Sequence, residues 1–226
     1  PVAMMGPERR ALGEGVPLAK GTALPTPRAR VARLPWRAFC GGAVLAFFFG
    51  LMMGTNSFQN VYFSEFHGAT AAQVGFFVAL SRLASGVMIS SVPSLARRWG
   101  MVRANVVLAL IAVPFYAALG LHLPLILALP IFLVAYSFFR GSWIMIINLM
   151  MSVVPSWHRG TQSSIRTVFV FLAMTLAGSL GGWLIVRVGY AAIFIMAAGA
   201  AMVTALAVWT FFRHDTIVLR RQEPAI

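Results

Sequence analysis

The chain has 226 residues, of which 60% are hydrophobic and only 10% charged, and its mean hydropathy is +0.84. Soluble proteins are about 45–50% apolar and about 25% charged, and a chain of this length has too little interior to bury so much apolar side chain. These proportions exclude a water-soluble enzyme, and the single cysteine, Cys40, excludes a disulfide scaffold. The net charge of +13 lies in the gaps between apolar runs, so we expect the lipid bilayer as a partner and no nucleic acid.

Residues 1–37 differ in composition from the rest of the chain. They hold six prolines and seven basic residues and show no helical periodicity. This composition predicts a basic, proline-rich cytoplasmic linker or tail. A second basic cytoplasmic tail is expected over residues 213–226.

Six apolar stretches lie between these two tails. Each has nearly the length that a helix rising 1.5 Å per residue needs to cross about 30 Å of hydrocarbon. Thr70 and Gln73 form a capping-box pattern, which sets the start of the second stretch. We therefore predict an all-α integral membrane domain over residues 38–212, built as a bundle of six transmembrane helices. The six stretches are residues 38–59, 71–93, 104–121, 125–152, 164–186 and 190–212.

The basic residues alternate between the two sides of the predicted bundle. Fifteen of the 18 Lys and Arg lie in the tails and at the even-numbered connections, with Arg166 counted there although it falls just inside the fifth stretch, and the other three connections hold only Arg187. Basic residues accumulate on the cytoplasmic side of membrane helices. We therefore predict a multi-pass plasma-membrane protein of the bacterial inner-membrane type, with both termini in the cytoplasm.

The two remaining arginines lie inside predicted spans. Arg82 is near the middle of the second span and Arg140 near the middle of the fourth, where one such residue costs about 2.5–3.5 kcal/mol on insertion scales. No Asp or Glu falls within a predicted span, so each guanidinium must face water, carbonyl groups, a partner's acid or an anionic ligand. Tyr136 and Trp143 stand one turn from Arg140 on the same side of the helix. These four residues are candidates for solute binding, and the alternative is that the arginines hold helix junctions together.

Polar residues close the first predicted span. Asn56 and Gln59 are candidates for contacts with a solute, because an amide both donates and accepts hydrogen bonds. Alternatively they cap the helix at the membrane interface, as we expect for Asn60 and Tyr62. Asn148, in the fourth span, is typical of a buried amide that bonds between helices. Small residues in the fifth span predict close helix packing, and they are Ala173, Ala177, Gly178, Gly181 and Gly182.

The connection between the second and third spans reads PSLARRWGMVR, from Pro93 to Arg103. It resembles the cytoplasmic loop signature of the major facilitator superfamily, G-x-L-A-D-R-x-G-R-K, in which Pro93 stands for the first glycine and Arg97 for the aspartate. With Arg97 in the place of the acid, Arg98 and Arg103 are expected to act as topology determinants. The matching positions are Leu95, Ala96, Arg98 and Gly100.

The connection between the fourth and fifth spans reads VPSWHRGTQSS. It resembles the family's Pro…Arg-Gly turn at Pro155, Arg159 and Gly160, and a glycine-rich stretch like the family's penultimate span follows it. Over residues 38–212 the order and spacing of these pieces resemble the C-terminal six-helix half of such a transporter.

This resemblance implies two six-span halves with the solute site between them near mid-membrane. The first, second, fourth and fifth spans would face the cavity, which places Arg82, Arg140, Asn56 and Gln59 on cavity helices. The resemblance also implies that residues 1–37 end a central linker, and that the partner is an N-terminal six-helix half or a second copy of the chain.

We therefore expect a secondary active transporter, as a half or a fragment, that moves a small-molecule solute by alternating access. An organic anion is one candidate, because arginine can hold a carboxylate or phosphate bidentately. The alternative is a non-transporting membrane assembly or interaction protein, or a decayed transporter fragment. A membrane hydrolase is disfavoured because all four histidines lie in connections and no Gly-x-Ser-x-Gly occurs. We expect no catalytic residue, no cofactor and no metal.

Overall fold

The computed structural model describes residues 36–121, 123–154 and 156–213. The two predicted tails, residues 1–37 and 213–226, therefore lie almost wholly outside the described residues. Within these ranges every regular element is helical and no strand occurs. Six helices are long and apolar enough to cross a membrane, which confirms the predicted number of spans.

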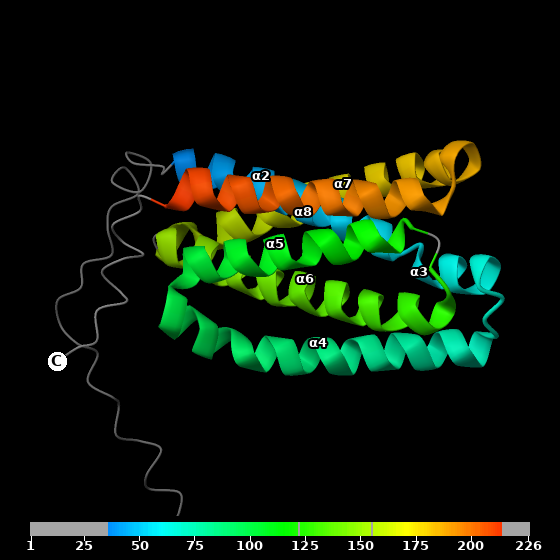
Figure 1. Cartoon of the computed structure of the whole chain (residues 1–226). Coiled ribbons are helices and arrows are strands. Elements are labelled where there is room, and N and C mark those ends of the chain that lie inside the picture. The colour runs from blue at the N-terminus through cyan, green and yellow to red at the C-terminus, as the bar shows by residue number, and fades with distance from the viewer. Residues whose placement is uncertain (1–35, 122, 155, 214–226) are drawn as a thin grey trace, which may run out of the picture. The chain divides into compact units, whose positions relative to one another are not determined.

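The helices run back and forth, so that α2 begins and α8 ends at the same end of the bundle (Figure 1). Three short elements, α3 (Gln59–Val61), the π-helical turn η2 (Tyr62–Phe66) and the 3₁₀ turn η3 (Ser156–His158), connect the long ones. The last span matches the prediction at both ends. The long helices are α2 (Trp36–Asn56), α4 (Ala71–Trp99), α5 (Met101–Leu119), α6 (Leu125–Val153), α7 (Arg159–Val188) and α8 (Tyr190–Phe212).

The predicted loop between the second and third spans is almost entirely helical, so that prediction was wrong. Helix α4 continues to Trp99 and carries Leu95 and Arg98 in its last turns, while Arg103 lies in the first turn of α5. The turn is Gly100 alone, whose φ of 81° is readily open only to glycine. Leu, Ala and Arg are strong helix formers, which extends α4 beyond Pro93. Likewise, the predicted turn residues Arg159 and Gly160 begin α7.

The first apolar span is longer than predicted. Helix α2 is followed by α3 and η2, so that the span extends from Ala38 to Phe66. It therefore includes Glu65, which corrects the expectation that every carboxylate lies outside the spans. The hydroxyl of Tyr190, at the start of α8, donates a 2.6 Å hydrogen bond to Glu65 Oε2. This contact joins the end of the first span to the start of the last.

The six long helices make equivalent contacts in their first and second halves. Helix α2 packs against α7 and α8, α6 packs against α4 and α5, and α5 packs against α8. If α2, α4 and α5 are exchanged with α6, α7 and α8 in that order, the same pairs of helices are in contact. The core lies among α2, α5, α6 and α8, whereas α4 and α7 are the least buried spans. Their outer faces carry exposed apolar side chains, among them Phe76, Leu83, Val87, Val168, Phe171 and Trp183.

Small residues let α2 and α7 approach closely. A Cβ atom on Gly50 would lie 2.5 Å from the Val170 carbonyl oxygen and 2.8 Å from Ala173 Cβ. A Cβ atom on Gly54 would lie 2.5 Å from Ala177 Cβ. This contact confirms the packing role predicted for Ala173 and Ala177. The packing prediction was wrong for Gly178 and Gly182, because a Cβ atom on either would meet no atom within 4 Å.

We predict that Gly50→Leu destabilises the chain and that Gly178→Leu does not. A leucine at residue 50 must push two backbones apart, at a cost of about 1–3 kcal/mol, whereas a leucine at residue 178 extends into open space. Thermal unfolding of the detergent-solubilised variants, followed by circular dichroism, measures the difference. Equal melting temperatures for the two variants would contradict the close α2–α7 contact.

Candidate functional site

One cavity of about 340 Å³ opens on the bundle near its mid-length. Side chains from α2, α3, α4, α6 and α7 line it. Arg140 lies about 20 Å of helix from either end of α6, at 1.5 Å per residue, so the cavity is at membrane depth. The lining residues are Met53, Asn56, Ser57, Gln59, Asn60, Val78, Arg82, Tyr136, Phe139, Arg140 and Met174.

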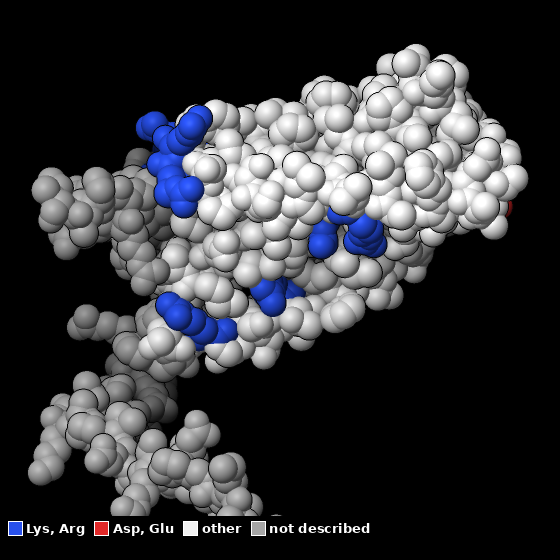
Figure 2. Space-filling view, turned by 90° about the horizontal axis from the view of Figure 1, so that it is seen from below, with Lys and Arg blue, Asp and Glu red and all other residues white. Residues whose placement is uncertain are grey.

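The structure brings five of the six predicted solute-binding residues to this cavity. Arg82 reaches it from α4, Tyr136 and Arg140 from α6, and Asn56 and Gln59 from α2 and α3. Asn56 and Arg140, the two of these residues that lie farthest from each other in the sequence, are 84 positions apart. On the face shown in Figure 2, basic side chains gather near one end of the bundle and again midway along it.

The sixth predicted residue, Trp143, does not line the cavity. Its ring stacks on Phe49 with a centroid distance of 3.6 Å, and Phe49 also stacks on Phe139 at 4.5 Å. Arg166 of α7 lies over the Trp143 ring, with its Cζ 5.8 Å from the centroid. Arg166 lies inside α7 and thus covers an aromatic stack beside the cavity.

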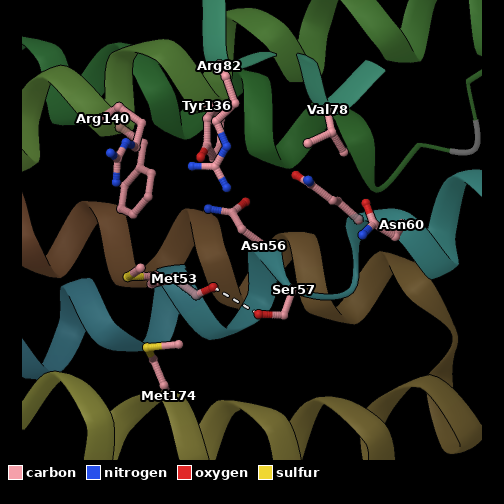
Figure 3. A pocket seen from close by; sticks show the side chains of 11 residues that line it. Met53, Asn56, Ser57, Asn60, Val78, Arg82, Tyr136, Arg140 and Met174 are labelled. Carbon is pink, nitrogen blue, oxygen red and sulfur yellow. Dashed lines mark hydrogen bonds between the residues drawn. The ribbon is translucent and has the colours of Figure 1, made fainter. Parts of the chain in front are cut away.

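Arg82 is held beside an aromatic ring rather than beside an acid. Its Cζ lies 5.5 Å from the centroid of the Tyr136 ring, within the range of a cation–π interaction. Figure 3 shows the Arg82 guanidinium next to Tyr136 and directed toward the amide of Asn56. The described residues that line the cavity include no Asp or Glu. The two positive charges of Arg82 and Arg140 therefore face a cavity wall without a carboxylate.

A buried tyrosine orients the amide of Asn56. The hydroxyl of Tyr116, on α5, donates a 3.2 Å hydrogen bond to Asn56 Oδ1, and Tyr116 is only 1% exposed. Because Tyr116 engages the oxygen, the amide nitrogen is the atom of this side chain that has no partner among the described residues. Sequence reasoning missed Tyr116; the signal was a hydroxyl group in an otherwise apolar span.

Three polar atoms of the cavity residues are buried and have no hydrogen-bond partner in the described part of the chain. Two are donors, Asn56 Nδ2 and Arg140 Nε, and one is an acceptor, Gln59 Oε1. Buried polar groups in folded proteins nearly always have partners. These atoms therefore mark the cavity wall as a surface for a polar ligand.

Asn105, and not Asn148, is the amide that bonds to α6 from a neighbouring helix. Asn105 Nδ2 donates to the Ser142 carbonyl oxygen at 2.7 Å and to Ser142 Oγ at 3.2 Å, which joins α5 to α6. Asn148 is exposed on α6, which corrects the prediction that it is buried. Its spacing on the helix could not show whether a neighbour lies opposite.

Comparison of the chain with models of protein families, with curated proteins and with solved structures finds no match.

We predict that Tyr116→Phe destabilises the chain because it leaves the buried oxygen of Asn56 without a donor. An unsatisfied buried acceptor costs about 1–3 kcal/mol. Tyr62→Phe is the matched control, since its buried hydroxyl has no hydrogen-bond partner and its removal should cost little. Melting temperatures in detergent provide the comparison, and a larger loss for Tyr62→Phe would argue against the role of Tyr116.

Proposed function

We propose that this chain forms one six-helix half of a secondary active transporter of the major facilitator type, which moves a small solute by alternating access. The observation that carries the proposal is the cavity at membrane depth, which Arg82 and Arg140 line together with amide side chains and without a carboxylate. Charged residues within membrane helices usually mark the path of a solute or ion. Such transporters bind their solutes near the middle of the membrane, in a cavity at the interface between repeats.

The contacts among the helices support this proposal. Equivalent packing of the first and last three long helices is what two repeats of opposite orientation produce, because an odd number of helices reverses the direction of the chain. Helices α4 and α7 border the cavity through Arg82 and Met174 and expose apolar faces beside it. A second bundle packed on these faces, either an N-terminal half or a second copy, would enclose the pathway.

The chemistry of the cavity favours an organic anion as the solute. Guanidinium groups bind carboxylates and phosphates through paired, charge-assisted hydrogen bonds. A cation would meet two like charges in a medium of low dielectric constant, which strengthens the repulsion. A neutral solute would leave both charges uncompensated.

A non-transporting membrane assembly protein is the competing proposal, favoured by the exposed apolar faces of α4 and α7. Such a protein needs these faces but has no use for a polar cavity. Substitutions in the cavity therefore distinguish the two proposals.

We predict that Arg140→Gln lowers the initial rate of organic-anion uptake into proteoliposomes by about tenfold or more. The loss of a charge-assisted hydrogen bond corresponds to about 1.5–3 kcal/mol. Arg97→Gln is the control, because Arg97 lies at the end of α4 and outside the cavity. Both variants should insert into membranes in amounts equal to the parent. Unchanged uptake by Arg140→Gln would rule against the proposed transport site.

The distribution of charge supports a cytoplasmic location for the end at which α2 begins. Arg97, Arg98, Arg103 and Arg159 lie at this end, and Arg187 at the opposite one. A plasma membrane of the bacterial inner-membrane type is part of the proposal.

We predict that a membrane-impermeant maleimide labels Leu121→Cys in intact cells but not Ser156→Cys, both in a Cys40→Ser background. Leu121 and Ser156 are exposed and lie in connections at opposite ends of the bundle. Permeabilised cells provide the control, in which both cysteines should react. The reverse pattern in intact cells would invert the proposed topology.

A further inference from the structure

The charge of the cavity defines the charge of its preferred ligand. Arg82 and Arg140 supply two positive charges, and the described lining supplies no negative one. A ligand with one negative charge leaves one guanidinium uncompensated at membrane depth, whereas a dianion compensates both. Isolated charge in such surroundings is costly. The electrostatics therefore favour a dianion.

The hydrogen-bonding atoms of the cavity define a second property of the ligand. Asn56 Nδ2 and Arg140 Nε are unpartnered donors, which an ionised carboxylate can satisfy. Gln59 Oε1 is an unpartnered acceptor, which an ionised carboxylate cannot satisfy because it accepts hydrogen bonds only. A ligand that brings a donor of its own satisfies this acceptor, and a hydroxyl group adds such a donor without adding positive charge.

The volume of the cavity limits the size of the ligand. A cavity of about 340 Å³ lies at the lower end of the range of about 300–1,000 Å³ that is usual for small-molecule sites. A ligand of about ten non-hydrogen atoms fits within this space. Aliphatic hydroxydicarboxylates with four carbon atoms have this size.

We propose that the cavity binds a small hydroxylated dicarboxylate, with its two carboxylates toward Arg82 and Arg140 and its hydroxyl group donating to Gln59 Oε1. This inference rests on the site assigned in the proposed function and names its substrate class. Asn56, oriented by Tyr116, donates its amide nitrogen to a carboxylate. Gln59 is the residue that distinguishes a hydroxylated dicarboxylate from a plain one.

The first experiment compares ligands that differ by one group. Isothermal titration calorimetry on the full chain in lipid nanodiscs at pH 7 uses malate, succinate, which lacks the hydroxyl group, and lactate, which lacks one carboxylate. We expect malate to bind about three- to tenfold tighter than succinate, as the loss of one net hydrogen bond predicts. Lactate should bind more weakly than malate, because it leaves one arginine without a counter-charge.

The second experiment tests the assignment to Gln59. Gln59→Met keeps the length of the side chain but removes the acceptor oxygen, so malate affinity should fall to that of succinate while succinate affinity stays unchanged. Gln73→Met is the matched control, because Gln73 caps α4 outside the cavity and should leave the preference for malate intact.

The outcomes separate this inference from the proposed function. Equal affinities for malate and succinate, no binding of either, or a preference for malate that survives Gln59→Met would overturn the substrate class. If another anion is taken up in an Arg140-dependent manner while malate does not bind, the transport function stands and the substrate class fails. If malate binds with the expected pattern but no proteoliposome uptake occurs, the substrate class stands and the transport function fails.

Discussion

The cost of placing two guanidinium groups at membrane depth governs the arrangement of this protein. Each such group carries a penalty of about 2.5–3.5 kcal/mol at the bilayer centre, and the described part of the cavity wall offers no acid to reduce it. Packing of α4 against α6 brings Arg82 and Arg140 to one polar cavity. There an aromatic ring lies 5.5 Å from Arg82, and the amides of Asn56 and Gln59 line the same space. Both charges are thus turned toward a single polar space and away from the apolar outer faces.

The remainder of the bundle holds this cavity open and in register. Close contact of α2 with α7 through Gly50 and Gly54 leaves no room for side chains between them and so fixes the position of Asn56. Behind the cavity, the stacked rings of Phe49, Phe139 and Trp143 fill the space between α2 and α6. Asn105 joins α5 to α6 with two hydrogen bonds, and Tyr116 of α5 then reaches Asn56. Rigid apolar packing therefore orients the few polar atoms.

Prediction from sequence succeeded where the signal was local and failed where it depended on neighbours. The capping box of Thr70 and Gln73 set the start of α4, and the hydrogen bonds are present. The end of α4 was misplaced by six residues, because the loop signature was taken to lack helical structure although its residues favour a helix. Arg82 and Arg140 were selected by their cost in a membrane. Trp143 was selected by helical spacing alone, and the stack on Phe49 turned out to occupy it.

Hydropathy, the spacing of basic residues and the scarcity of acids can be read from the order of residues along the chain, and they determine the six spans and the presence of two arginines at membrane depth. The meeting of Asn56, Arg82 and Arg140 around one space is a tertiary property, because it depends on which helices pack side by side and on their rotation about their axes. The role of Tyr116 is also a tertiary property, since its hydroxyl donates a hydrogen bond to Asn56, which lies 60 residues earlier in the sequence. Helix periodicity defines the face on which a side chain lies, whereas only packing decides what that face meets.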